Sequence, residues 1–305
     1  MRLRIGTRGS KLAVAQSMWV KRQIELRHKD IDVELVKIKT KGDKILDSPL
    51  NKIGGKGLFV KEIESALLMK KIDMAVHSLK DVPFELPDGL EIGIYPKREN
   101  PLDAFISVYF NNIKQLPEGA KIGTSSLRRQ VQLRFLYPHI RVVPVRGNVD
   151  TRLKKLYKGD FDGIILAAAG LVRLGLKSNI TQIISEDIMI PAVGQGSLGI
   201  EIRRDDELLK KLLFFMNHRE TEICVKAERS FLKELGGGCQ IPIAGYAKIE
   251  DNKLIIKGMV SDIIGEKYLL DMLTGDINNP QDLGRKLAHR LFDKGAKDIL
   301  RGIYE

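Results

Sequence analysis

The sequence predicts an α/β protein with two related α/β lobes, followed by a smaller α+β domain. Three observations point to this fold class. Short apolar runs alternate with helix-like segments over the first half of the chain and then start again, as they do in parallel sheets. Two strand–turn–helix units open with the same residue types, Ile5-Gly6-Thr7 and Ile122-Gly123-Thr124. The last third changes to two helices, three strand-like runs and a final helix.

The first lobe is expected to open with a strand over Arg2–Gly6 and a helix from Ser10, a residue type suited to the N-cap. The spacing of four apolar residues predicts one face of this helix: Leu12, Ala15, Trp19 and Leu26. The elements expected next are strands at Val33–Lys39, Ile72–His77 and Leu90–Tyr95, and a helix through Phe59, Ile63, Ala66 and Leu67.

The second lobe is expected to start after Pro101. Its predicted strands are Ala104–Val108, Lys121–Gly123, Ile140–Val145 and Gly163–Ala168, with basic helices after Ser126 and Asn148. For the C-terminal third we expect helices at Asp206–His218, Glu220–Leu235 and Pro280–Lys294, and strands at Ala244–Ile249, Leu254–Ser261 and Lys267–Leu273.

Composition excludes several classes of protein. No apolar run approaches the ~18 residues that a membrane helix needs, and the first residues do not resemble a signal peptide. Two cysteines cannot form a disulfide framework, which favours a reducing cytoplasm. The five histidines are scattered and no Cys-x-x-Cys occurs, so we expect no metal site.

Positive charge is concentrated in one stretch. The chain carries a net charge of +12, and between Lys121 and Asp160 ten Lys or Arg face two Asp. Such a field attracts polyanions, either nucleic acid or a small molecule with many carboxylates. Only three aromatic residues interrupt this stretch and no known nucleic-acid-binding motif is present, which places nucleic acid second.

Residues 194–199 match the dinucleotide-binding pattern G-x-G-x-x-G. That pattern requires a helix after the glycines, whereas Ile200–Arg203 alternates like a strand. The sequence therefore argues against a dinucleotide site.

Asp81 follows the strand Ile72–His77, where side chains of a parallel sheet enter the ligand crevice. It can be read as a catalytic carboxylate or as a turn residue bonded to its own backbone. Position alone favours the turn residue.

Five basic or hydroxyl-bearing segments also follow predicted strands. They are Thr7-Arg8-Gly9-Ser10, Thr124-Ser125-Ser126 with Arg128 and Arg129, Arg146-Gly147-Asn148, Arg152 and Arg173. One such segment is usually a solvated helix face, but five of them favour a cleft for a multiply anionic ligand.

Cys239 follows three glycines, which leave its thiol open to close approach by a bulky group. A cysteine that carries a group and a half-buried cysteine after a helix end fit this spacing equally well. Cys224 lies in an amphipathic helical run and is expected to be a core residue.

Seven segments in order resemble the porphobilinogen deaminase (hydroxymethylbilane synthase) family. They are Gly6–Ser10, Gly54–Phe59, His77–Pro83, Gly123–Gln130, Arg146–Val149, Pro191–Gly196 and Gly237–Pro242. The resemblance spans about 240 residues, from Gly6 to Pro242, and it decides for the functional readings of Asp81 and Cys239.

The resemblance implies two periplasmic-binding-protein-like (type II) α/β lobes around a cleft, plus a small α+β C-terminal domain with a three-stranded sheet. It implies domains of residues 1–96 with 197–216, 97–196 and 217–305. It also implies a cytoplasmic monomer that binds neither nucleic acid nor membrane.

The implied enzyme is a transferase of haem biosynthesis. It holds one dipyrromethane cofactor through a thioether to Cys239, adds four porphobilinogens and releases the linear tetrapyrrole with water. Each addition requires loss of ammonia to give a cationic azafulvene, which Asp81 would stabilise while it moves protons.

The implied carboxylate-binding residues lie in both lobes: Arg8, Ser10, Lys80, Arg128, Arg129, Arg146, Arg152 and Arg173. Ser126 and Gln195 would support them, Phe59 would stack on a pyrrole or join the core, and residues 41–56 would form a flap or a simple surface loop. The alternative is a two-lobed binding protein for an anionic ligand or nucleic acid.

Overall fold

The computed structural model describes residues 1–44, 57, 60–237 and 241–304. The chain divides into two compact units, one of Met1–Glu99 with Ser197–Glu222 and one of Asn100–Gly196 with Ile223–Glu305. The division into three domains with the bounds expected from the sequence stays a prediction.

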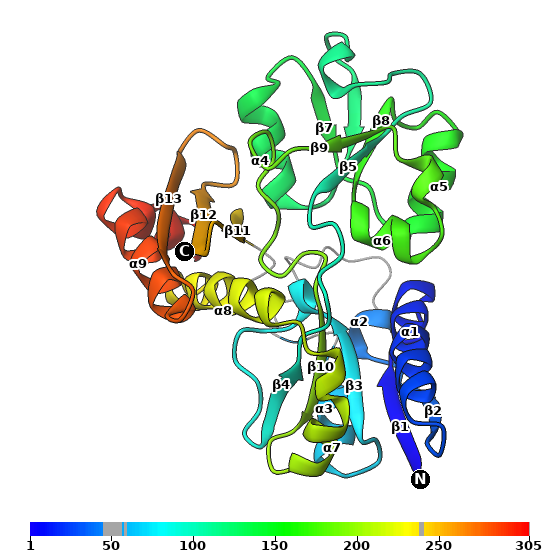
Figure 1. Cartoon of the computed structure of the whole chain (residues 1–305). Helices are drawn as coiled ribbons and strands as arrows, with labels where there is room; N and C mark the ends of the chain where they lie inside the picture. Colours follow the sequence, from blue (N-terminus) through cyan, green and yellow to red (C-terminus); the bar gives the residue numbers. More distant parts are fainter. Residues whose placement is uncertain (45–56, 58–59, 238–240, 305) are drawn as a thin grey trace. The chain divides into compact units, whose positions relative to one another are not determined.

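Unit 1 is built on a five-stranded sheet in the order β2-β1-β3-β10-β4 (Figure 1). Its strands are β1 (Arg2–Thr7), β2 (Asp32–Lys37), β3 (Met74–Ser78), β4 (Leu90–Ile94) and β10 (Leu198–Arg203). β1 pairs in parallel with β2 and β3, but β10 is antiparallel to both β3 and β4. The sheet is therefore mixed, because one central strand arrives from a distant part of the chain.

The helices of unit 1 pack beside this sheet. They are α1 (Lys11–Arg27), α2 (Lys41–Lys44), α3 (Lys61–Leu68) and α7 (Glu207–Leu213), the last followed by a 3-10 turn, Phe214–Met216. The expected apolar face of α1 is wrong, since Trp19 and Leu26 are 42% and 64% exposed. Val20 and Ile24 are buried there instead, and Gln16 shares their face because its amide is hydrogen-bonded inside the unit.

Unit 2 contains a second five-stranded sheet in the order β7-β6-β8-β5-β9. Its strands are β5 (Asp103–Ile106), β6 (Lys121–Gly123), β7 (Arg141–Val143), β8 (Gly163–Ala167) and β9 (Gln182–Ile184). β5 is antiparallel to its neighbours and occupies the place that β10 has in the first sheet. The two sheets share one topology, which confirms the expectation of related lobes.

Three helices follow strands of this second sheet: α4 (Leu127–Leu136), α5 (Val149–Tyr157) and α6 (Ala168–Arg173). Asn148 caps α5, since its side chain accepts a hydrogen bond from the backbone N–H of Thr151 at 3.0 Å. Ser126 precedes α4 but makes no such side-chain cap.

The C-terminal elements form a three-stranded antiparallel sheet with helices packed on it (Figure 1). They are α8 (Arg219–Glu234), β11 (Ile243–Glu250), β12 (Lys253–Ser261), β13 (Tyr268–Asp276), α9 (Pro280–Asp293) and α10 (Ala296–Tyr304). Phe231 and Leu287 are fully buried in this core, and Cys224 joins it at 7% exposed, as expected.

The sequence did not predict α10. Gly295 separates it from α9 with a φ of +100°, a left-handed conformation that ends a helix at glycine. In the parts of the chain that the structure describes, no helix combines the length and the hydropathy needed to cross a membrane.

The fold is mixed α/β, with two lobes that each contain a sheet and a small C-terminal three-stranded sheet. This confirms the fold class expected from the sequence.

Candidate functional site

A cavity of about 60 Å³, lined by both polar and apolar side chains, lies at the carboxyl ends of β1 and β3 in unit 1. β3 ends at Ser78 and continues as a 3-10 turn, Leu79–Asp81, that is anchored by the buried side chain of Leu79. Leu79 also donates its backbone N–H to the carbonyl of Ser197 at 3.0 Å. This anchored turn holds Asp81 at the cavity wall.

The carboxylate of Asp81 is exposed at the cavity. Among the residues that the structure describes, it makes no hydrogen bond or ion pair, and no bond to its own turn. Its two oxygens are therefore available to a ligand. The catalytic role of Asp81 stays a prediction.

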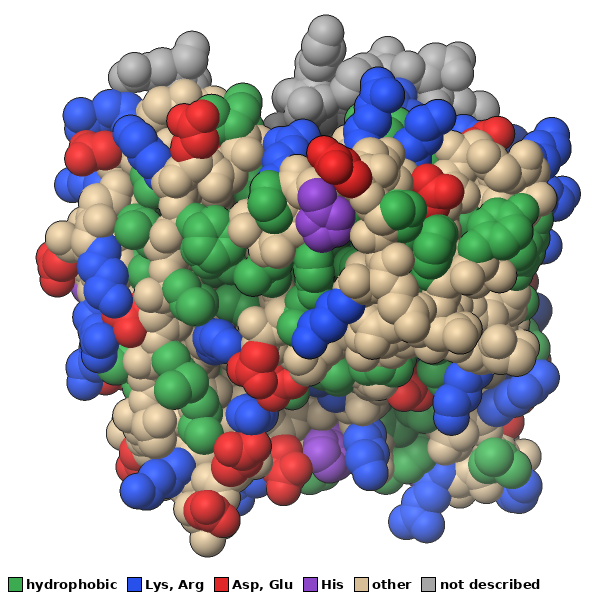
Figure 2. All heavy atoms as spheres, turned by 90° about the horizontal axis from the view of Figure 1, so that it is seen from above, with side chains coloured by type: hydrophobic (Ala, Val, Ile, Leu, Met, Phe, Trp, Pro, Cys, Tyr) green, Lys and Arg blue, Asp and Glu red, His purple; other side chains and the backbone are tan. Residues whose placement is uncertain are grey.

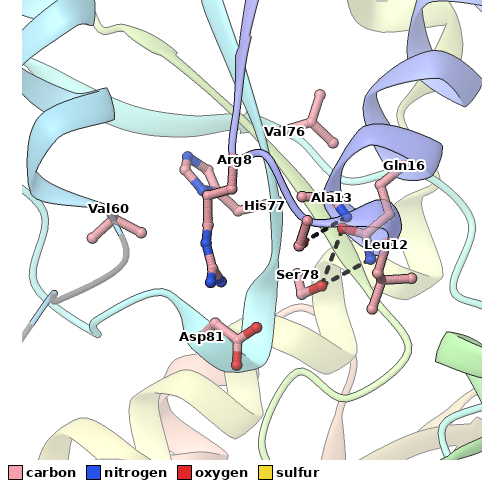
Figure 3. Close-up of a pocket in the computed structure, with 10 residues that line it drawn as sticks. Arg8, Leu12, Ala13, Gln16, Val60, Val76, His77, Ser78 and Asp81 are labelled. Atoms are coloured by element: carbon pink, nitrogen blue, oxygen red, sulfur yellow. Dashed lines mark hydrogen bonds between the residues drawn. The ribbon is translucent and has the colours of Figure 1, made fainter. Parts of the chain in front are cut away.

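Arg8 and Ser10 line the same cavity from the turn between β1 and α1. The guanidinium group of Arg8 points toward Asp81 (Figure 3). Ser10 is the N-cap of α1, and its hydroxyl accepts from the backbone N–H of Ala13 at 3.2 Å. Gln16, one turn further on, donates to the hydroxyl of Ser78 at 2.8 Å and so ties α1 to the end of β3. Lys80 is next to Asp81 in the chain but is not among the residues that line the cavity.

A buried group of three ionisable side chains adjoins the cavity. His77 lines the cavity, and its Nε2 lies 2.9 Å from Oε2 of Glu201 on β10. Both side chains are nearly inaccessible, at 5% and 1% exposed. Glu64 on α3 is also buried, and burial, then the charge of Glu201, raises its pKa to about 7, although His77 and Lys61 act in the opposite direction.

We expect Glu64→Gln to make the stability of unit 1 less sensitive to pH. The Glu64 carboxyl has a higher pKa in the folded protein than in the unfolded chain. Between pH 4.5 and about 7 the folded state therefore binds more protons than the unfolded state, and its stability falls as the pH rises through this range. Removing this group is expected to stabilise the protein by about 3 kcal/mol more at pH 8 than at pH 4.5. Urea unfolding at both pH values measures the difference.

Glu62→Gln is a suitable control, because Glu62 is a glutamate on the same helix. Its carboxylate accepts a hydrogen bond from the backbone N–H of Lys41, which the amide oxygen of glutamine can also accept. If Glu64→Gln and the unaltered protein lose stability in parallel with pH, the Glu64 carboxyl is not neutral in the folded state.

Unit 2 contains a buried ion cluster at the start of α4. Asp103, fully buried, accepts from Nη1 of Arg128 at 2.8 Å and from Nη2 of Arg129 at 2.7 Å. The carbonyls of Ile190 and Ile165 accept from the same two arginines. Burial alone would raise the pKa of Asp103, but the two guanidinium groups hold it well below its usual range.

This cluster also holds Gln195, whose amide donates to Asp103 at 2.9 Å and to the carbonyl of Pro101 at 2.7 Å. Arg128 and Arg129 thus share the carboxylate of Asp103, and these three side chains together carry one net positive charge. Arg128 has a buried Nε that meets no acceptor in the described part of the chain.

Arg152 lies on α5, and its Nε donates to the carbonyl of Gly147 at 2.8 Å. Within the described residues no carboxylate pairs with it. Burial, and then the charge of Arg129, lowers the pKa of Arg152 to about 10. Arg152 and Arg129 therefore form a cationic region that an anion would stabilise.

The remaining predicted residues are distributed as follows. Arg146 is exposed after β7, and Ser126 is partly exposed just before α4. Arg173, at the end of α6, donates to the carbonyl of Gly196 at 2.7 Å. The predicted anion-binding segments thus belong to two sheets, with Arg8 and Ser10 in unit 1 and the others in unit 2.

Some predicted residues lie outside the described ranges. They are Cys239, Phe59 and residues 45–56 of the 41–56 segment. The described part of the chain places Gly194 and Gly196 before β10 and Gly199 within it, so a strand follows, as the argument against a dinucleotide site required.

Sequence reasoning missed Asp103, His77, Glu201 and Glu64. His77 lies in the segment His77–Pro83 that carries the family resemblance. A histidine on an apolar strand indicates that a buried hydrogen-bond partner lies nearby. Asp103 was within the run at the start of the second lobe, but nothing local shows that two arginines 25 and 26 residues later bind it.

Two family models match the chain. Residues 3–211 match "Porphobilinogen deaminase, dipyromethane cofactor binding domain", and residues 222–293 match "Porphobilinogen deaminase, C-terminal domain".

Curated relatives match along the whole chain. The porphobilinogen deaminase of Trichlorobacter lovleyi is 50% identical over 306 residues, which cover 100% of this chain and 97% of that protein. The porphobilinogen deaminase of Carboxydothermus hydrogenoformans is 49% identical over 299 residues, 98% of this chain and 96% of that protein.

Among solved structures, a periplasmic substrate-binding protein of an ABC transporter from Coxiella burnetii is similar. It has a TM-score of 0.43 and 16% identity, and the match covers 69% of this chain and 90% of that one.

Proposed function

Because this chain belongs to the porphobilinogen deaminase family, we propose that porphobilinogen loses ammonia at the Asp81 pocket and that the arginines bind its carboxylates. The enzyme has the hydroxymethylbilane synthase activity of tetrapyrrole biosynthesis. It joins four porphobilinogen units head to tail on a dipyrromethane primer and releases hydroxymethylbilane with water.

The observation that carries the proposal is the exposed carboxylate of Asp81 opposite Arg8, which bonds to none of the residues that the structure describes. When ammonia leaves the aminomethyl group of porphobilinogen, the remaining carbon and the pyrrole ring become cationic. A fixed carboxylate beside this group favours the cation, and its effect is strongest where water is scarce. The same oxygens can accept the pyrrole N–H and hold the ring in place.

Two features of unit 2 fit a ligand with many carboxylates. Arg152 is a partly buried cation that lacks a carboxylate partner in the described part of the chain, and Arg128 presents a buried donor without an acceptor there. Arg129 adds positive charge nearby. We propose that Arg128 and Arg129, with Arg146, Lys80 and Ser126, hold the cofactor. The residues proposed to contact the substrate and growing chain are Arg8, Ser10, Arg152, Arg173, Gln195 and Phe59.

The dipyrromethane cofactor supplies the free α-carbon to which the first substrate unit is joined. We propose that Cys239 holds it through a thioether. Cys224 cannot serve this role, since it is buried in the C-terminal core. Arg128 and Arg146 would neutralise the acetate and propionate groups, and Asp81 would hold the pyrrole N–H groups.

Intact-mass measurement tests this assignment with Cys239→Ser and the matched control Cys224→Ser. The native chain and the control are expected to exceed their sequence masses by two porphobilinogens less two ammonias, and Cys239→Ser is not. An unmodified native chain that gains this mass when porphobilinogen is added is an apoprotein. A chain that gains none contradicts the assignment.

We further propose a cytoplasmic monomer of three domains (1–96 with 197–216, 97–196 and 217–305) that binds neither nucleic acid nor membrane. The two-cysteine composition supports the reducing compartment. On the face shown in Figure 2, basic side chains are interspersed with acidic and hydrophobic ones, unlike the broad basic surface that nucleic acids favour. Salt-dependent binding of DNA or RNA would contradict this proposal.

A further inference from the structure

His77 connects the Asp81 pocket to a buried acidic pair. Its side chain lines the pocket together with Arg8 and Asp81 (Figure 3). On its other side, Nε2 contacts Oε2 of Glu201 at 2.9 Å. Any change in the charge of the buried groups therefore reaches the pocket across a single imidazole ring.

The acidic pair consists of Glu201 and Glu64, and one carboxylate oxygen of Glu201 accepts no hydrogen bond from the described residues. Oε1 of Glu201 is buried and has no hydrogen-bond donor within the described residues. A buried carboxylate oxygen without a donor is unfavourable, and a second carboxylate nearby makes it more so. Glu64 of α3 is that second carboxyl, and it is 6% exposed.

A single bound proton does not neutralise the side chains of Glu64, His77 and Glu201 taken together. If His77 is charged and both carboxyls are ionised, the group carries one net negative charge in a buried place. A second proton makes it neutral. Because burial disfavours uncompensated charge, the neutral form is preferred until the solution is basic enough to remove that proton.

We propose that Glu64, His77 and Glu201 form a proton-binding cluster that sets the charge beneath the Asp81 pocket and thereby tunes how tightly porphobilinogen binds. Glu64 and Glu201 act through His77 and are positioning residues. This inference rests on the proposed function for its substrate, but the proton binding itself does not.

Other charged groups around the cluster are neutralised or directed elsewhere. On α3 itself, Lys61 lowers the pKa of Glu64 but is exposed to solvent. On β1, Arg4 is paired with Asp73 at 2.9 Å. On β4, Glu91 is paired with Lys210 at 2.8 Å.

On the pocket side of His77, the charged neighbour is Arg8, whose positive charge faces the negative charge of Asp81. The net charge beneath the pocket is therefore decided by the cluster.

Loss of the second proton should weaken substrate binding. The pKa of Glu64, about 7, places this loss near neutral pH. Porphobilinogen carries two carboxylates, so a new negative charge behind His77 is expected to raise KM about threefold to tenfold between pH 6 and pH 8.5. The same charge favours the cation that forms during reaction, so kcat should not fall with it.

Two measurements on Glu64→Gln and the control Glu62→Gln test the cluster. In carbon-13 NMR titrations, the side-chain carboxyl signal of Glu64 is expected to show a step near pH 7 in the unaltered protein and in the control, and this signal is expected to be missing from the spectrum of Glu64→Gln. In steady-state assays of the loaded enzyme, KM of Glu64→Gln is expected to lose its rise between pH 6 and pH 8.5.

The two readouts separate failure of the cluster from failure of the proposed function. A Glu64 carboxyl signal that shows no step near pH 7 overturns the cluster, whatever the activity. A protein that shows the NMR step but does not consume porphobilinogen keeps the cluster and contradicts the function. If Glu64→Gln does not fold, Glu201→Gln replaces it, and an unchanged step near pH 7 overturns the proposal equally.

Discussion

Replacing Asp81 by Asn is expected to lower kcat about 100- to 10,000-fold while the protein remains folded. Asn has nearly the same shape as Asp, but it carries no charge to stabilise a cation and cannot accept a proton. Because Asp81 is exposed and makes no bond within the described residues, its removal leaves no buried partner unsatisfied. Stability should therefore change by less than about 0.5 kcal/mol.

Asp88→Asn is the matched control, since Asp88 is an exposed carboxylate in the connection between the Asp81 turn and β4. It should keep full activity. Intact mass reports the cofactor content of each variant, so rates can be compared per loaded enzyme. Slow cofactor loading in Asp81→Asn would agree with the prediction, because the primer is built from the same substrate. Normal loading and normal turnover would show that Asp81 is not catalytic.

The sequence predicted the local part of the Asp81 pocket well. A strand that ends before a polar turn places the turn residues at the carboxyl edge of a parallel sheet, and β3 does this for Asp81. Ser10 was expected to cap α1 and does so. These features depend on residues within a few positions of one another, where spacing is informative.

The parts that sequence reasoning missed depend on distant contacts. β10 enters the centre of the first sheet from residue 198, and this strand brings Glu201 against His77, which lies 124 positions earlier. No periodicity encodes such a pairing. The buried face of α1 was missed for a related reason, because Gln16 is satisfied by Ser78, 62 positions away, and so can be buried beside apolar residues.

The arginines show a second limit. The sequence identified Arg128 and Arg129 as cations at a helix start, but it did not reveal that Asp103 already binds both. Their first partner is a residue of their own unit, so their effect on a ligand is that of a pre-arranged pair with one net positive charge. A residue type can suggest an anion site, but only the fold shows how much of the charge remains.

Asp103→Asn is expected to destabilise unit 2 by about 3–5 kcal/mol, because it leaves two buried guanidinium groups without a carboxylate. The pKa of Asp103 is lowered in the folded state, so its contribution to stability is present above its unfolded pKa and is lost as the pH falls through the folded value. The loss caused by Asp103→Asn should therefore be the same at pH 6 and pH 8.

Asp73→Asn provides the comparison on a more exposed pair. Asp73 also accepts from an arginine, Arg4, but their side chains are 18% and 37% exposed, and its loss should change stability by about 0–1 kcal/mol. Hydrogen exchange of peptides from α4 and β5 measures the change in stability inside unit 2. Urea unfolding, in contrast, reports the stability of the whole chain. Adding Arg128→Met to Asp103→Asn removes one of the two uncompensated cations and should restore part of the stability. Equal losses from Asp103→Asn and Asp73→Asn would mean that the buried cluster is solvated like a surface pair, and Arg128 and Arg129 would then be free to bind a ligand with their full charge.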